Sequence, residues 1–181
     1  MDSPNQTTPD LYELIDLFFD DPAELASFEE ISVDELPLDY QSLLAHDQHM
    51  TVTIEKYHGC RAELEVLEEI HSGDYYSRKI LLRRSTDHRI VQYGIVRLDL
   101  SVLDSDIRDQ IQNKQTPLGR ILIENEVLRK VRLASTWHVT SQGELARYLG
   151  LNERTPDCFG RTALIYCNDK PAVQLLEIVV D

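Results

Sequence analysis

Apolar runs separated by short polar turns constrain the fold of this chain more than any other feature. The runs cover residues 50–59, 62–74, 75–87, 89–101 and 159–181. Between or within them stand the segments HSGD, STDH and CNDK, which are compact turn signals. Short turns between apolar runs are typical of antiparallel hairpins. The pattern therefore predicts a sheet of about six strands, most of them paired with their neighbours in the sequence.

Helical spacing of apolar residues occupies most of the remaining chain. Helices are predicted within residues 9–21, 38–47, 103–114, 117–130 and 141–150. The acidic stretch 20–37 is predicted to be a connector with a helical turn. Along the chain, most predicted strands come first, helices follow, and a hairpin comes last. This order indicates an α+β domain.

Length and charge limit the kind of protein. A chain of 181 residues suits one core, here placed at residues 36–181 after an acidic N-terminal extension, residues 1–35. The net charge of −14 disfavours a nucleic-acid surface and docking on an anionic membrane. No apolar run is long enough to span a membrane. Three cysteines without a CxxC pair favour a reducing, cytoplasmic location.

Motifs for common cofactors and nucleophiles are absent from the sequence. There is no GxGxxG, P-loop, GxSxG or HExxH. The densest group of possible metal ligands is His46, Asp47, His49, His58 and Cys60. Their spacing matches no ordinary zinc pattern, so a polar surface explains them better. We therefore expect no metal and no cofactor.

The segment TPLGR, residues 116–120, is a candidate anion site. Thr116 is a favourable N-cap and Pro117 a favourable first helical residue. The backbone amides of Leu118 and Gly119 would then lack partners within the helix, at the positive end of its dipole. Gly119 has no side chain to obstruct a ligand. An ordinary helix start explains the same residues without a ligand.

Two charged residues interrupt apolar strand faces. Arg78 alternates with Tyr76, Ile80 and Leu82, and a guanidinium on an apolar face needs a partner. Glu177 is the only charge within the apolar run AVQLLEIVV. If it is buried, this carboxylate must be paired, hydrogen-bonded or neutralised, whereas a strand near the edge of the sheet would expose it. Arg78 could bind a ligand carboxylate, or it could form an internal salt bridge with Glu177.

These features occur in an order that resembles the chorismate pyruvate-lyase family, in particular a divergent branch of it. The similar segments are DQHMT at 47–51, YGIVRLDLSVL at 93–103, TPLGR at 116–120 and GRTALIYCNDKPAVQLLEI at 160–178. The resemblance covers roughly residues 36–180. It implies an antiparallel sheet with helices packed on one side. The bacterial enzymes carry an arginine where this chain has Ile95, and Arg97 is the candidate replacement.

The resemblance also implies a role for each site residue. Arg78 would bind a ligand carboxylate, with help from the backbone amides of Met50, Leu118 and Gly119. Glu177 would accept a hydrogen bond from the hydroxyl group of the ring. Arg78 and Glu177 would be the catalytic residues.

The implied activity is conversion of chorismate to 4-hydroxybenzoate and pyruvate, as in quinone biosynthesis, without a metal. That reaction requires positioning of the substrate and stabilisation of charge on the ether oxygen. Two alternatives stay open. One is a small-carboxylate-binding module of the same fold, like the effector domains of certain transcription regulators, although no basic helix-turn-helix is visible. The other is a related enzyme that acts on a different hydroxylated carboxylate.

Overall fold

A single antiparallel sheet forms the centre of the molecule in the computed structural model, which describes residues 8–149 and 157–180. Its strands are β1 (Ala26–Ile31), β2 (Ala62–Ser72), β3 (Tyr75–Arg84), β4 (Ile90–Asp99), β5 (Arg129–Ser141), β6 (Asp157–Cys167) and β7 (Lys170–Val179). The seven strands lie in the order β1-β5-β6-β7-β4-β3-β2. The predicted α+β class is therefore confirmed.

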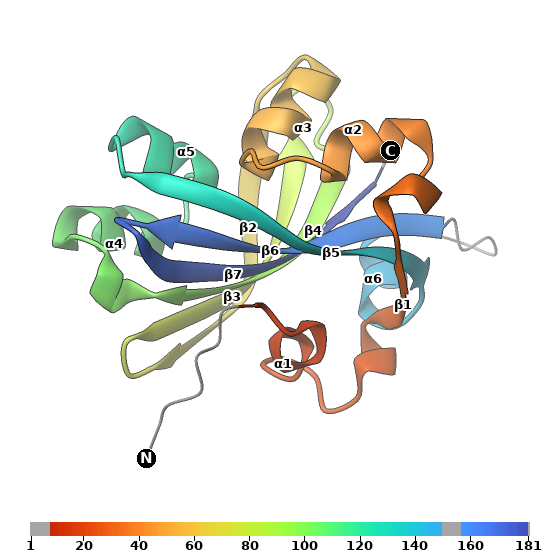
Figure 1. The fold of residues 1–181 in the computed structure, drawn as a ribbon, viewed down its shortest axis with the longest axis horizontal. Coiled ribbons are helices and arrows are strands. Elements are labelled where there is room, and N and C mark those ends of the chain that lie inside the picture. Colours follow the sequence, from red (N-terminus) through yellow and green to blue (C-terminus); the bar gives the residue numbers. More distant parts are fainter. Residues whose placement is uncertain (1–7, 150–156, 181) are drawn as a thin grey trace.

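Six helices accompany the sheet in the described residues (Figure 1). They are α1 (Leu11–Ile15), α2 (Leu38–Leu44), α3 (Met50–His58), α4 (Ser105–Gln112), α5 (Leu118–Glu124) and α6 (Gly143–Leu149). The described residues also contain three short 3₁₀ helices, η1 (Pro22–Glu24), η2 (Val33–Glu35) and η3 (Leu100–Val102). Helices α2 to α5 pack on one face of the sheet, and α1 and α6 cover part of the other.

Local turn chemistry explains the hairpins that the sequence predicted. Gly73 joins β2 to β3 with φ of 59°, a left-handed conformation that glycine adopts without strain. Asn168 and Asp169 join β6 to β7, both with positive φ, as a tight hairpin turn requires. The predicted strands at 62–74, 75–87, 89–101 and 159–181 are all present, with shorter bounds.

The predicted strand at 50–59 is wrong, because these residues form α3. β-branched residues in TVTI favour a strand locally, but this preference is weak against tertiary packing. Met50 and Ile54, one helical turn apart, are both buried against the sheet. Gly59 then ends the helix in the left-handed conformation with φ of 65°.

Two strands, β1 and β5, form where the sequence predicted other structures. The connector predicted at 20–37 contains β1, which pairs with β5 at the edge of the sheet. The helix predicted at 117–130 ends at Glu124, and Glu126 has φ of 53°, which a continuing helix cannot contain. Strand β5 begins at Arg129. Division of the chain near residue 35 stays a prediction; β1 and α1 pack on the same sheet as the rest.

A group of paired charges lies on the sheet face under α1 and α6, with Lys79 and Glu144 buried and Glu68 exposed. Lys79 of β3 lies 3.1 Å from Glu144 of α6 and 2.8 Å from Glu68 of β2. Tyr93 of β4 donates a hydrogen bond to Glu144 at 3.0 Å. Lys79 also lies over the ring of Phe19 of the α1 segment, 4.6 Å from its centroid. Lys79 and Glu144 are thus paired within the protein.

Candidate ligand-binding site

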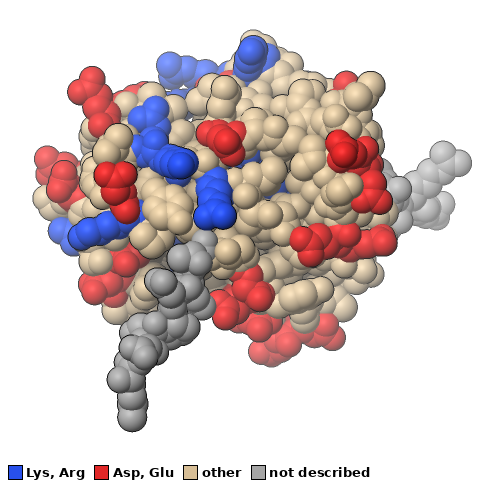
Figure 2. Space-filling view, viewed as in Figure 1, with Lys and Arg blue, Asp and Glu red and all other residues tan. Residues whose placement is uncertain are grey.

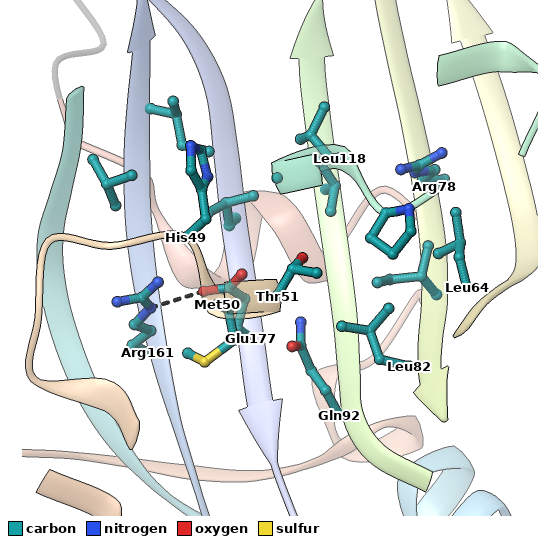
Figure 3. Close-up of a pocket in the computed structure, with 17 residues that line it drawn as sticks. His49, Met50, Thr51, Leu64, Arg78, Leu82, Gln92, Leu118, Arg161 and Glu177 are labelled. Carbon is teal, nitrogen blue, oxygen red and sulfur yellow. Dashed lines mark hydrogen bonds and ion pairs between the residues drawn. The ribbon is translucent and has the colours of Figure 1, made fainter. Parts of the chain in front are cut away.

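A small cavity lies between the sheet and the starts of α3 and α5. Its free volume is about 40 Å³. It is lined by side chains of β2, β3, β4, β5, β6 and β7 and by the two helix starts. All five residues singled out by the sequence line it: Met50, Arg78, Leu118, Gly119 and Glu177. The structure therefore brings them together, and Figure 3 shows Arg78 and Glu177 on different strands of the same wall.

Arg78 is buried without a carboxylate partner. Its side chain is on β3, 1% exposed, and Nη1 donates to the carbonyl oxygen of Ile111 at 3.2 Å. Nε has no hydrogen-bond partner among the described residues. Burial lowers the pKa of Arg78, whereas Tyr76 and Glu69 act in the opposite direction. A guanidinium remains protonated even so, and an unpaired buried charge is costly.

Glu177 pairs with Arg161 and not with Arg78. Arg161 Nε donates to Glu177 Oε2 at 2.8 Å, and the two residues stand directly opposite each other on β6 and β7 (Figure 3). The internal salt bridge between Arg78 and Glu177, left open by the sequence, is therefore absent. Strand β4 lies between β3 and β7 and separates the two side chains.

Arg161 is the site residue that sequence reasoning missed. Its side chain is fully buried, and its remaining nitrogens donate to the carbonyl oxygens of Leu44, His46 and Gln48 at 2.8–3.3 Å. It thereby fixes the α2–α3 connection to the sheet. The pattern that marked Arg78 also marks Arg161, because Phe159, Ala163 and Ile165 surround it at alternating positions.

His49 is a second missed residue. The sequence favoured a polar surface for it, but its side chain is buried at the start of α3 and lines the cavity. Burial, and then the nearby charges of Arg129 and Arg161, lower the pKa of His49 to about 4. The imidazole is therefore neutral at physiological pH. Its Nε2 atom has no hydrogen-bond partner among the described residues.

Unpartnered polar atoms concentrate in this cavity. Four buried side-chain polar atoms of the described residues lack a hydrogen-bond partner. Three of them, His49 Nε2, Arg78 Nε and Gln92 Oε1, belong to residues that line the cavity. Buried polar atoms are nearly always hydrogen-bonded, so such a cluster requires an explanation. With Glu177 neutralised by Arg161, the cavity wall carries one positive charge in excess, from Arg78.

The anion site expected at TPLGR differs from its predicted geometry. Helix α5 begins at Leu118 with Pro117 as N-cap, so Thr116 is outside the helix. A Cβ atom added to Gly119 would lie 2.9 Å from Cβ of His49 and 3.2 Å from Oγ1 of Thr51. The glycine is therefore needed for close approach of α5 to the start of α3, whether or not a ligand binds.

Replacement of Gly119 with alanine is thus expected to destabilise the fold by about 1–3 kcal/mol through overpacking. The gain in helix propensity, about 1 kcal/mol, offsets only part of this loss. Urea unfolding of wild type and Gly119→Ala gives the difference directly. Equal or greater stability of the variant would show that the two helices can separate freely and that the glycine serves another purpose.

Arg97 does not take the place of the arginine missing at Ile95. Ile95 and Arg97 lie on the sheet face opposite the cavity, since residues of one parity share a face. The guanidinium of Arg97 instead lies over the ring of Tyr75, 4.5 Å from its centroid.

Comparisons with known proteins support the fold and not the expected activity. No protein-family model and no curated protein matches the chain. The solved structure of PhnF from Mycobacterium smegmatis is similar, with TM-score 0.50, 12% identity and coverage of 72% of this chain and 63% of that chain. The chain thus spans less than two thirds of PhnF. The PhnF effector domain matches with TM-score 0.50, 14% identity and coverage of 73% and 88%.

A third similar structure is a GntR-family transcriptional regulator from Enterococcus faecalis, with TM-score 0.44, 11% identity and coverage of 64% and 91%. The prediction of a chorismate pyruvate-lyase that makes 4-hydroxybenzoate and pyruvate for quinone biosynthesis is wrong: the similar structures with a TM-score of 0.50 are PhnF and its effector domain, and no comparison supports a lyase. The catalytic roles assigned to Arg78 and Glu177 lose their basis with it. Physically, Glu177 is already neutralised by Arg161, and the free volume is small.

No helix within residues 8–149 and 157–180 has the length and apolar character needed to cross a membrane. In the same part of the chain, no three His, Cys, Asp or Glu side chains gather in a way that could hold a metal ion.

Proposed function

We propose that this domain is a binding module for a small carboxylate, without catalysis. The observation that carries the proposal is Arg78: it is buried in the cavity wall without a carboxylate partner, and its Nε, a donor, has no acceptor among the described residues. A carboxylate would neutralise Arg78 and accept from its Nε. The likeness to the PhnF effector domain supports a ligand-responsive role.

Each of the five lining residues that the sequence singled out has a role in this proposal. Arg78 forms the ion pair with the ligand. Met50 and Leu118 supply apolar walls, and Gly119 lets α5 approach closely enough to close the site. Glu177 keeps Arg161, and with it the α2–α3 connection, in place. A cytoplasmic location belongs to the same proposal, supported by three free cysteines.

The volume of the cavity limits the ligand in the closed form. An engineered protein cavity of about 150 Å³ accommodates benzene. The cavity here, about 40 Å³, is too small for an aromatic ring. A short carboxylate therefore fits the closed form, whereas a ring would require α3 or α5 to move. Chorismate, with a ring and two carboxylates, lacks support as the ligand.

The test compares Arg78→Met with wild type in thermal melts with acetate, propionate and benzoate. A ligand present at 100 times its dissociation constant stabilises the folded state by about 2.7 kcal/mol. We expect this stabilisation in wild type with acetate and propionate, and its loss in Arg78→Met, whereas stabilisation by benzoate would show that α3 or α5 moves to admit a ring. Without ligand, the variant should be as stable as wild type within about 1 kcal/mol, because methionine replaces an unpaired charge by an apolar chain of similar length.

Two controls make the result specific. Acetamide and benzamide have the shape of the acids without the charge and should not stabilise the protein. Arg97→Met removes an arginine from the opposite face of the sheet and should retain the response. If no carboxylate stabilises wild type, or if Arg78→Met responds as wild type does, the proposed function is wrong.

A further inference from the structure

An open groove adjoins the cavity on its outer side. It lies between the start of α3, with the residues just before it, and the segment from the end of α5 into β5, and its volume is about 980 Å³. It is lined by Asp47, Gln48, His49, Val52, Ile123 and residues 126–131. His49 and Val131 line both the groove and the cavity. The neutral ring of His49 therefore lies between the enclosed cavity and the much larger open groove.

The groove contains a cation without an anionic partner. Arg129 is half-buried, and its Nη1 donates only to the carbonyl oxygen of its near neighbour Val127, at 3.1 Å. No carboxylate of the described residues lies within ion-pair distance of Arg129, although Asp47 and Glu126 also line the groove and are exposed. Lys130, next in the chain, also borders the groove, but the alternation of side chains along β5 directs its side chain to the face opposite Arg129.

A half-buried cation without a carboxylate is unusual in a protein with 32 acidic and 18 basic residues. Figure 2 shows acidic side chains spread over the visible face, whereas most visible Lys and Arg side chains lie on the side where β5 begins. A half-buried guanidinium without a carboxylate, in such an acidic protein, favours an external anion as its partner.

We infer that the cavity and the groove are two subsites for one elongated ligand with two anionic groups. This inference rests on the proposed function: the first group pairs with Arg78 in the cavity, and the second lies in the groove beside Arg129. The middle of the ligand passes His49 and Val131 and lies against the apolar side chains of Val52 and Val127.

The sheet sets the length of such a ligand. Arg78 is on β3 and Arg129 on β5, which are separated by four inter-strand steps in the sheet. Four steps of about 4.8 Å give roughly 19 Å across the sheet. Leu133 is the residue of β5 in register with Arg78, and Arg129 lies four residues before it, which adds about 13 Å along the strand. The two backbones are therefore roughly 23 Å apart. A short dianion cannot reach both cations, whereas a linear chain of suitable length can.

Isothermal titration on the full chain tests the inference with linear dicarboxylates of increasing length, sebacate, dodecanedioate and hexadecanedioate. The matched monocarboxylates are decanoate, dodecanoate and hexadecanoate. We expect the dicarboxylate of best length to bind about tenfold more tightly than its monocarboxylate, the magnitude of one charge-assisted hydrogen bond. Arg129→Gln should remove this preference and change monocarboxylate binding less than about twofold. Arg132→Gln, an exposed arginine on the same strand outside the groove, should retain it.

The outcomes separate this inference from the proposed function. If monocarboxylates bind through Arg78 but no dicarboxylate gains affinity, the groove is not a subsite, and the small-carboxylate function stands. If the dicarboxylate preference survives in Arg129→Gln, or is lost equally in Arg132→Gln, the assignment to Arg129 is wrong. If neither series binds wild type, both proposals fail.

Discussion

Replacing Arg161 with methionine is expected to lower the free energy of unfolding by about 3–5 kcal/mol, because it leaves Glu177 as an uncompensated buried charge. Both side chains of this ion pair are nearly inaccessible to solvent. The substitution also leaves the carbonyl oxygens of Leu44, His46 and Gln48 without their donor. Buried acceptors without partners add to the loss. Urea unfolding of wild type and variant measures the difference.

A matched substitution distinguishes the loss of an ion pair from the loss of any buried arginine. Arg78→Met removes the same residue type from the same face of the sheet, at nearly equal burial, but without a carboxylate partner. It should change stability by no more than about 1 kcal/mol. The double variant Arg161→Met/Glu177→Leu should recover part of the loss, since no unpaired charge remains. Equal losses in Arg161→Met and Arg78→Met would refute this division between a structural and a ligand-binding arginine.

Acidification should destabilise the protein through His49. The pKa of its side chain is about 4 in the folded protein, below the ordinary value of 6.5. The unfolded chain therefore binds a proton at a higher pH than the folded protein does. Stability due to His49 is fully present above pH 6.5 and is lost as the pH falls toward about 4. A depression of this size corresponds to about 3 kcal/mol.

The variant His49→Gln isolates this contribution, because glutamine keeps a polar side chain and does not titrate. Denaturation curves from pH 4 to 8 should show a steeper acid loss in wild type than in the variant, and the difference between the two should be constant above pH 6.5. His46, whose pKa burial also lowers, is present in both proteins and contributes to both curves. Parallel curves throughout the range would show that His49 is solvated in the folded state.

Much of the fold follows from local features of the sequence. The turns at Gly73 and at Asn168–Asp169 adopt positive φ, and their residue types predict hairpins. Four of the predicted strand runs form strands as a result. Helix α3 and strands β1 and β5 were not predicted, because their residues have weak or opposite local preferences. Burial of Met50 and Ile54 against the sheet, and pairing along β5, decide their structure.

The site shows the same division between sequence and tertiary structure. A lone charge among apolar strand residues is visible in the sequence, and this rule singled out Arg78 and Glu177, both of which are buried in the structure. Their partners depend on the order of strands in the sheet, which no local pattern specifies. Because β6 lies beside β7, Glu177 meets Arg161, and because β4 separates β3 from β7, Arg78 lacks a carboxylate among the described residues. The sequence by itself determined that single charges would stand among apolar residues on this sheet. Only the tertiary structure decided which of them has a partner of opposite charge, since ion pairing requires atoms within about 4 Å in space and takes no account of distance along the chain.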